Sequence, residues 1–252
     1  MMIDIHSHIL PGIDDGATDW TESLKICTLA ANLGCRAMIA TPHQRHPTWW
    51  NTEDVKLEIL LNRLQEQIGD RLRLYLGAEI RVGKGFMQDL DRFESSGLAS
   101  LAGSDYLLLE FERRELSVDP IDIVQRVQAA GWRPIVAHPE FIRSIAKDRQ
   151  LAKTLVDAGA LTQITAMSVT GDFGFEAKEC ASALMDAGLV HFVASDCHGY
   201  RHRPPGLKGA ISKIKAKWGR EYATQLTVEN PRAVLENRPV EPLGVGTLTA
   251  RE

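Results

Sequence analysis

The sequence has few aromatic residues and no marked excess of charge of either sign. Aromatics make up 6% of the 252 residues, and 29 Lys and Arg stand against 33 Asp and Glu, for a net charge of −4. A broad basic surface for nucleic acid is therefore not expected. The composition, 44% hydrophobic and 25% charged, is that of an ordinary folded domain and argues against disorder.

Long apolar runs, an export signal and paired cysteine motifs are also lacking. No apolar run approaches the roughly 20 residues that cross a bilayer. The first residues, MMIDIHSH, lack the positive end and apolar stretch of a secretory signal. The cysteines show no CxxC spacing, namely Cys27, Cys35, Cys180 and Cys197. We expect a cytoplasmic protein with free thiols and no membrane insertion.

β-rich runs alternate with amphipathic helical stretches along most of the chain. Strands are predicted at Ile3 to His6, Arg36 to Thr41, Leu72 to Glu79, Tyr106 to Phe111, Pro134 to His138, Leu161 to Thr165 and His191 to Ser195. Strands separated by helices imply parallel pairing, because a parallel return requires a crossover. Seven such units closed into a ring predict an α/β barrel.

One helix is especially clear, because five apolar residues share a face that ends before Gly69: Leu57, Leu60, Leu61, Leu64 and Ile68. We expect a single catalytic barrel over residues 1–240, since one barrel commonly spans this length. Residues 241–252 lack periodicity and are expected to form a loosely ordered tail.

Two histidines end the first predicted strand. His6 and His8 are two residues apart, so the strand's period of two places both imidazoles on one face, where they can share a metal ion. Further candidates fall at or just after other strand ends: His43, Glu79, Glu110, His138, Asp196 and His198, with Asp15 in the loop after the first strand. The carboxyl ends of barrel strands meet at one mouth. Taken singly, such residues are often turn, capping or solvated groups. Together they indicate a metal site.

These motifs resemble the polymerase and histidinol phosphatase superfamily over nearly the full length. The motifs are Asp4-Ile-His-Ser-His8, Asp14-Asp15-Gly16, Thr41-Pro-His43, Gly77-Ala-Glu79, His138-Pro-Glu140 and Ser195-Asp-Cys-His198. Within it, the chain is most similar to the manganese-dependent bacterial protein-tyrosine phosphatases of capsule and exopolysaccharide synthesis. Arg203-Pro-Pro205 adds to that likeness.

The resemblance implies a distorted seven-stranded barrel with three divalent metal ions. It assigns His6, His8 and Asp196 to one ion, Glu110 and His138 to a second, and Asp15, His43 and His198 to a third. Glu79 would bridge the first two ions. The metal would be manganese, although imidazole and carboxylate ligands also suit iron and zinc.

Arg203 matches a family arginine that binds the substrate phosphate. A second family arginine directly follows the His-Pro-Glu motif, but Phe141 stands there in this chain. Arg143, two residues on, is predicted to take that role.

The resemblance also implies a reaction and a partner. Clustered divalent ions lower the pKa of bound water, so hydroxide can attack phosphorus near neutral pH. The expected substrate is a phosphotyrosine protein, the tyrosine-rich tail of a bacterial membrane-associated tyrosine kinase.

Other interpretations stay open from the sequence. Phe141 also allows a small-molecule phosphatase acting on a histidinol-phosphate-like substrate, a phosphodiesterase, or a metal-binding module without catalysis. Cys197 and Arg203 have the C-x5-R spacing of cysteine-dependent phosphatases, but Pro204 and Pro205 lack the backbone amides that cradle phosphate in that class. His46, His191 and His202 are expected to be structural or solvated.

Overall fold

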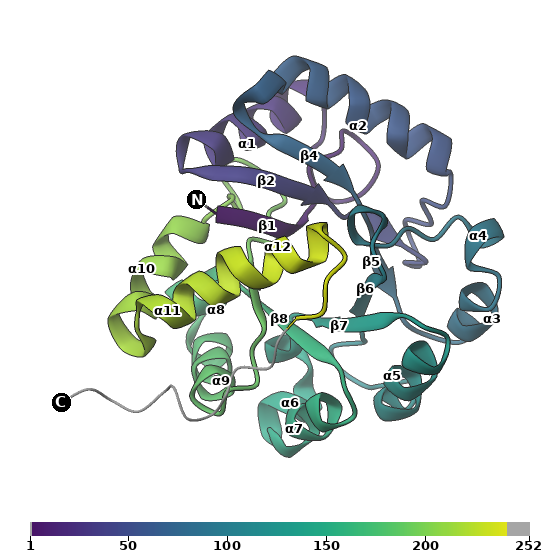
Figure 1. Ribbon diagram of the computed structural model, residues 1–252, viewed down its shortest axis with the longest axis vertical. Coiled ribbons are helices and arrows are strands. Elements are labelled where there is room, and N and C mark those ends of the chain that lie inside the picture. Colours follow the sequence, from purple (N-terminus) through teal and green to yellow (C-terminus); the bar gives the residue numbers. More distant parts are fainter. Residues whose placement is uncertain (1, 241–252) are drawn as a thin grey trace.

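The strands form two parallel sheets, with helices on their outer side (Figure 1). The computed structural model describes residues 2–240, apart from the side chain of residue 54. The first sheet has the order β1-β2-β4: β1 (Met2–Ser7), β2 (Cys35–Ala40) and β4 (Arg73–Leu76). The second has the order β3-β5-β6-β7-β8-β9: β3 (His43–Gln44), β5 (Glu79–Arg81), β6 (Tyr106–Glu110), β7 (Arg133–Ala137), β8 (Leu161–Thr165) and β9 (Phe192–Ala194).

The helices cover the strands from outside and close one end. They are α1 (Trp20–Asn32), α2 (Asp54–Ile68), α3 (Phe86–Leu90), α4 (Phe93–Ser96), α5 (Pro120–Ala129), α6 (Arg143–Lys147), α7 (Gln150–Asp157), α8 (Ala166–Thr170), α9 (Phe175–Asp186), α10 (Leu207–Trp218), α11 (Arg220–Thr224) and α12 (Asn230–Leu235). The predicted helix face of α2 is confirmed, with Leu57, Leu61, Leu64 and Ile68 buried.

The strands pack their inward side chains against one another. Alternate residues of β1, β2, β6, β7 and β9 join one apolar cluster, which α12 extends through Val234. The outward residues of the second sheet, such as Leu107, Leu109 and Val136, pack in a separate cluster with the covering helices. This inside and outside alternation is the period of two that a strand imposes.

The expectation of one closed sheet of seven strands is corrected in two respects. Among residues 2–240 the chain forms nine strands, in two sheets. The predicted strand at Leu72 to Glu79 changes partner near Gly77: β4 pairs with β2, and β5 pairs with β3 and β6. Gly77 donates its N–H to Ala40 at 2.8 Å, and a Cβ there would lie 2.9 Å from Ile39. A larger residue here would require the neighbouring side chains to shift.

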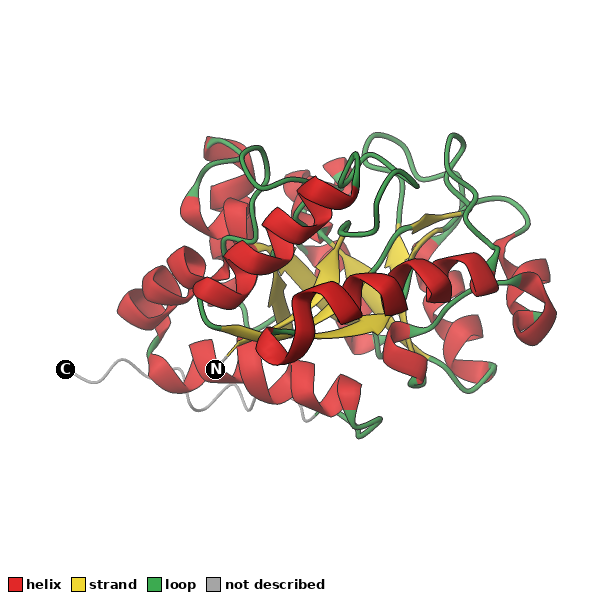
Figure 2. Cartoon of the chain, turned by 90° about the horizontal axis from the view of Figure 1, so that it is seen from above, coloured by secondary structure: helices red, strands yellow, loops and turns green. Residues whose placement is uncertain are grey.

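The first and last strands meet where β1 ends. Ser7 forms a parallel bridge with Cys197, and the N–H of Asp196 donates to the carbonyl of His6 at 2.9 Å. Long connecting loops gather on the side away from the N-terminus (Figure 2). The carboxyl ends of the parallel strands therefore share one face with these loops.

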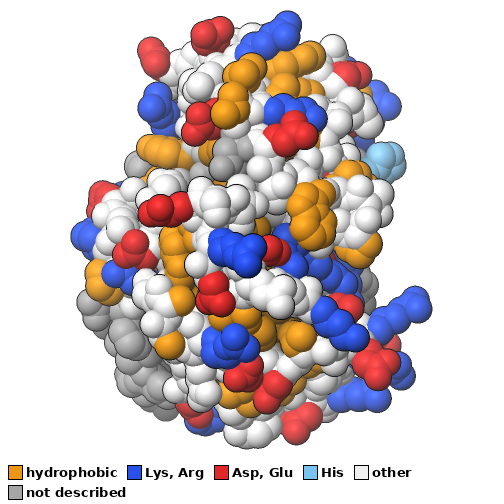
Figure 3. All heavy atoms as spheres, turned by 90° about the vertical axis from the view of Figure 1, so that its right-hand side faces the viewer, with side chains coloured by type: hydrophobic (Ala, Val, Ile, Leu, Met, Phe, Trp, Pro, Cys, Tyr) orange, Lys and Arg blue, Asp and Glu red, His pale blue; other side chains and the backbone are white. Residues whose placement is uncertain are grey.

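The surface and the remaining expectations can be stated briefly. Basic and acidic side chains are interspersed on the face seen in Figure 3. None of the helices among the described residues has the length and apolarity that a membrane crossing needs. All four cysteines are free and buried, as expected. The predicted tail, 241–252, lies outside the described residues.

Candidate metal centre

The predicted ligands converge at the carboxyl ends of the strands. Seven of them line a cavity of about 590 Å³: Asp15, His43, Glu79, Glu110, His138, Asp196 and His198. His6 and His8 belong to the same cluster but do not line the cavity, and their exposed fractions are 0% and 1%. The structure thus brings all nine predicted ligands into one cluster.

One compact group joins His6, His8 and Asp196, as the resemblance implies. The Nε2 atoms of the two imidazoles lie 3.3 Å apart. Oδ1 of Asp196 lies 3.5 Å from the first and 3.6 Å from the second. Three donor atoms this close can point at a single ion.

A second group contains the predicted Asp15, His43 and His198, and adds His8. Oδ1 of Asp15 lies 3.3 Å from Nε2 of His43 and 3.3 Å from Nε2 of His198. His8 therefore lies within reach of both groups.

The third group differs in one member from the expectation. Glu79 and Glu110 come together with His43, whereas the family resemblance pairs Glu110 with His138. His138 is nevertheless adjacent, because its Nε2 lies 2.7 Å from Oε1 of Glu79. Glu79 contacts at least one histidine of every group, a position that fits a bridging carboxylate.

The donors present fit divalent cations. Glu79 is buried among four imidazoles, at 2.7 to 3.3 Å from His6, His8, His43 and His138. Oε2 of Glu110 is buried without a hydrogen-bond partner. Unpaired buried polar atoms are costly, and a cation would satisfy them. Imidazole and carboxylate are ligands that manganese, iron and zinc all accept.

The same crowding shifts the pKa values of the cluster. Burial opposes protonation of His8, but Asp14 outweighs it and raises the pKa of His8 to about 9. Burial likewise opposes protonation of His43, yet Glu79 and Asp15 raise its pKa to about 11. Burial disfavours the charged form of Asp196, but His6 and Arg203 lower its pKa to about 2. Without metal ions, the cluster therefore holds protons that incoming cations must displace.

Several residues that orient the ligands were not assigned from the sequence. Oδ2 of Asp14 lies 2.8 Å from Nδ1 of His8 and accepts the N–H of His43 at 3.1 Å. Oε1 of Gln163 lies 2.8 Å from Nδ1 of His6. A partner on the far ring nitrogen fixes the orientation of a metal-binding imidazole. The only signal in the sequence for the role of Asp14 was that it directly precedes the predicted ligand Asp15.

The loop after β1 is held close to the strand that it follows. A Cβ on Gly16 would lie 2.1 Å from the carbonyl oxygen of His8, so no larger residue fits without a shift. Three site residues also have left-handed backbones: His138, Asp196 and Arg203, with φ of 32°, 50° and 54°. Such conformations cost about 1–3 kcal/mol each and cluster at functional sites.

The two predicted arginines occupy different positions. Arg203 lines the cavity and donates from Nη2 to Oδ2 of Asp196 at 2.5 Å, while its Nε is buried without a partner. Arg143 is exposed at the start of α6 and is not among the residues that line the cavity. The structure brings Arg203 to the metal cluster and leaves Arg143 outside the cavity.

Sequence reasoning missed most of the cavity wall. His46 and Trp49 line it, and their stacked rings have centroids 4.7 Å apart. Arg81 lines it too, with Nη1 2.9 Å from Oε1 of Glu110. The loop after β6 adds four charged residues, Glu112, Arg113, Arg114 and Glu115. His46, expected to be structural or solvated, thus faces the cavity although it joins none of the candidate metal groups.

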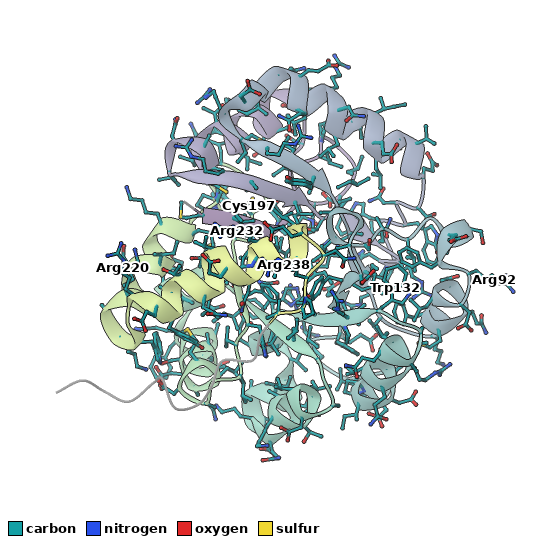
Figure 4. The ribbon with its side chains drawn as sticks, in the orientation of Figure 1. Arg92, Trp132, Cys197, Arg220, Arg232 and Arg238 are labelled. Carbon is teal, nitrogen blue, oxygen red and sulfur yellow. The ribbon has the colours of Figure 1, made fainter. Side chains whose placement is uncertain are left out.

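Cys197 is not placed to act as a nucleophile. It is fully buried beside β1 (Figure 4), and burial raises the pKa of its thiol well above the usual value. The N–H groups of His198 and Gly199 already donate to the carbonyl of Arg203. A phosphate loop needs free amides and an accessible thiolate, so the cysteine-dependent mechanism is excluded.

Fold and site together define a class of protein: parallel α/β domains that gather histidines and carboxylates for divalent metals at the strand ends. Residues 2–236 match the family model for capsular polysaccharide synthesis, CpsB/CapC. The chain therefore belongs to the CpsB/CapC family.

Individual relatives span nearly the whole chain. A protein named CapC from Staphylococcus aureus is 34% identical over 246 residues, covering 95% of this chain and 93% of its own length. Tyrosine-protein phosphatase YwqE from Bacillus subtilis is 34% identical over 241 residues, covering 95% and 93%. A crystal structure from work on YwqE and on CpsB from Streptococcus pneumoniae, described as metal-dependent tyrosine phosphatases, aligns with a TM-score of 0.90. It is 33% identical and covers 96% of this chain and 97% of that one.

Proposed function

We propose that this chain is a metal-dependent protein-tyrosine phosphatase that regulates capsule or exopolysaccharide synthesis. The observation that carries the proposal is the cluster of nine buried or cavity-lining ligands with Arg203 beside it. Its family and its relatives named tyrosine-protein phosphatases support the same activity.

We assign three divalent ions to the cluster, manganese being the metal that the family resemblance implies. His6, His8 and Asp196 would hold one. Glu110, His138 and the bridging Glu79 would hold a second, and Asp15, His43 and His198 a third. Bound ions supply an activated water and polarise the phosphoryl oxygens.

The remaining residues of the site suit a phosphorylated tyrosine. Arg203 lines the cavity, so its guanidinium can donate to a phosphoryl oxygen. The stacked rings of His46 and Trp49 offer the aryl group an aromatic wall. Tyrosinate, whose conjugate acid has a pKa of about 10, leaves more readily than an alkoxide. The site therefore needs no strong general acid.

The proposed partner is a phosphotyrosine protein, the tail of a bacterial tyrosine kinase. A flexible, tyrosine-rich tail could present each phosphorylated ring to a cavity that opens among loops.

The test is hydrolysis of a phosphotyrosine peptide by purified protein before chelation, after chelation, and after manganese is restored. We expect phosphate release that chelation abolishes and manganese recovers. Parallel assays with histidinol phosphate and a phosphodiester address the other substrates that the sequence left open. Turnover of either one, with none of the peptide, would refute the proposed substrate.

A further inference from the structure

Four arginines line the metal-centre cavity, and they differ in how their charges are held. Arg81 pairs with Glu110 at 2.9 Å, and Arg203 pairs with Asp196 at 2.5 Å. Among the described residues 2–240, Arg113 and Arg114 form no ion pair with a carboxylate. Their charges are therefore available to an anionic ligand in the same cavity.

Arg113 differs from Arg114 because its guanidinium lies over an aromatic ring, which we call its seat. Its Cζ lies 5.0 Å from the centroid of the Phe141 ring, a cation–π contact. Phe141 lies next to the metal centre, with its ring centroid 5.8 Å from that of His138. Within the described chain, Arg114 has no such contact.

Arg203 has the corresponding support on the other side. Its Cζ lies 5.7 Å from the centroid of Phe173. The rings of Phe141 and Phe173 pack edge to face, with centroids 5.3 Å apart and planes at 84°. One aromatic pair thus carries two cavity-lining arginines, one on each ring.

We propose that Arg113 and Arg203 form a two-armed clamp for the transferring phosphoryl group, seated on the Phe141–Phe173 pair. The clamp rests on the proposed phosphatase function. A phosphomonoester carries close to two negative charges, and the planar guanidinium matches phosphoryl oxygens with paired N–H donors. Arginine also stacks on aromatic rings, so the Phe141–Phe173 pair limits the conformations of both arginine side chains before the substrate binds.

The clamp gives a role to two residues that otherwise lack one. Phe141 stands where the family resemblance places an arginine, and here it supports an arginine from the loop after β6. Arg143 donates its backbone N–H to the carbonyl of Arg113 at 2.8 Å. It anchors the loop through its main chain, while its exposed side chain lies outside the cavity.

The test measures binding of inorganic phosphate to manganese-loaded protein by calorimetry, beside kcat and KM for a phosphotyrosine peptide. Arg113→Ala should weaken phosphate binding by about tenfold to a hundredfold. Arg113→Lys should recover only part of that loss, because lysine lacks the stacked fork. Arg220→Ala, on the outer surface at α11 (Figure 4), is the matched control and should bind phosphate as the wild type does.

A double-mutant cycle tests whether Phe141 affects phosphate binding through Arg113 or only through general packing. Phe141→Leu keeps an apolar side chain but removes the ring, and should weaken phosphate binding in the wild type by several-fold. In the Arg113→Ala background the same change should have little further effect. Equal losses in both backgrounds would overturn the seat, and so the clamp as proposed. Metal content and thermal unfolding of each variant show that the centre and fold persist.

The outcomes also separate the clamp from the proposed function. Phosphate binding that depends on Arg113, without peptide hydrolysis, would support the clamp and refute the phosphatase. Hydrolysis with phosphate binding unchanged in Arg113→Ala would refute the clamp alone. Loss on Arg143→Ala with none on Arg113→Ala would also overturn it, in favour of the other arginine.

Discussion

The cavity has a floor and a rim that are built in different ways. The floor consists of the nine candidate ligands at the strand ends, and all of them except Asp15 are at least largely buried. The rim consists of loop residues, namely His46, Trp49, Glu112, Arg113, Arg114 and Glu115. The positions of the floor side chains are fixed by the sheets and by contacts among the ligands. The positions of the rim side chains depend on the conformations of the loops. We therefore assign the chemistry to the floor and much of the substrate recognition to the rim.

The largest effect should come from removing charge from the floor. Glu79→Gln keeps the shape of the side chain but removes the carboxylate that contacts four imidazoles. Loss of metal stabilisation worth several kcal/mol corresponds to roughly a thousandfold in kcat/KM. Metal content by elemental analysis and steady-state kinetics would check it. Glu66→Gln, an exposed change on α2, is the control. Full activity in Glu79→Gln would contradict the role of the floor.

The stability of the protein should depend on pH differently in the metal-free and the metal-loaded form. The raised pKa of His8, about 9, stabilises the metal-free fold fully below the unfolded value of about 6.5. That contribution, a few kcal/mol, is lost as pH rises through 9. The lowered pKa of Asp196 contributes above about pH 4 and is lost towards pH 2.

Thermal unfolding from pH 6.5 to 9 checks this expectation. The Tm of chelated protein should fall across the range, while that of metal-loaded protein should change little, since bound metal keeps the imidazoles neutral. Parallel curves for the two forms would show that the histidines are not held as the structure indicates.

A residue that supports the floor should have an intermediate effect. Asp14→Asn weakens the contact to Nδ1 of His8 while keeping the size of the side chain. We expect metal affinity to fall by about tenfold to a hundredfold, with activity recovered at high manganese. Titration of chelated protein with manganese gives the affinity. The matched change Asp19→Asn, at the N-cap of α1, should leave metal affinity unaltered.

The smallest effect should come from the aromatic rim. Trp49→Leu removes the ring stacked beside His46, and an aromatic contact is worth about 0.5–1.5 kcal/mol. KM for a phosphotyrosine peptide should rise by about twofold to tenfold, with little change in kcat. An alkyl phosphate should show no such rise. An equal rise for both substrates would argue against recognition of the aryl ring.

The floor could be predicted from sequence because its signals are periodic and local. The spacing of His6 and His8, and the carboxyl ends of the strands, place ligands on one face whatever the loops do. The sequence does not show that His8 lies within reach of two groups, because such sharing depends on distances. The change of pairing partner near Gly77 was missed as well, since it depends on which strands lie next to each segment in space.

The rim could not be predicted for the opposite reason. Arg113 and Trp49 lie in segments without periodicity, so nothing in the sequence says which way they face. Arg143 was predicted because it lies two residues from Phe141 along the chain, and Arg113 was not considered. In the structure, Cζ of Arg113 lies 5.0 Å from the centroid of the Phe141 ring.

The junction of β1 with the segment after β9 bears on how the protein folds. His6 and Asp196 come from nearly opposite ends of the described chain, yet their backbones are hydrogen-bonded and their side chains face one another. The first strand can pair with β2 early, but its contacts with the segment after β9 form only once that segment has been made, and closing so long a loop has an entropic cost. An ion shared by these two segments would act as a clip across that loop, favouring the folded chain over every partly folded one. Closing the fold between these two segments and assembling the metal centre would therefore occur together.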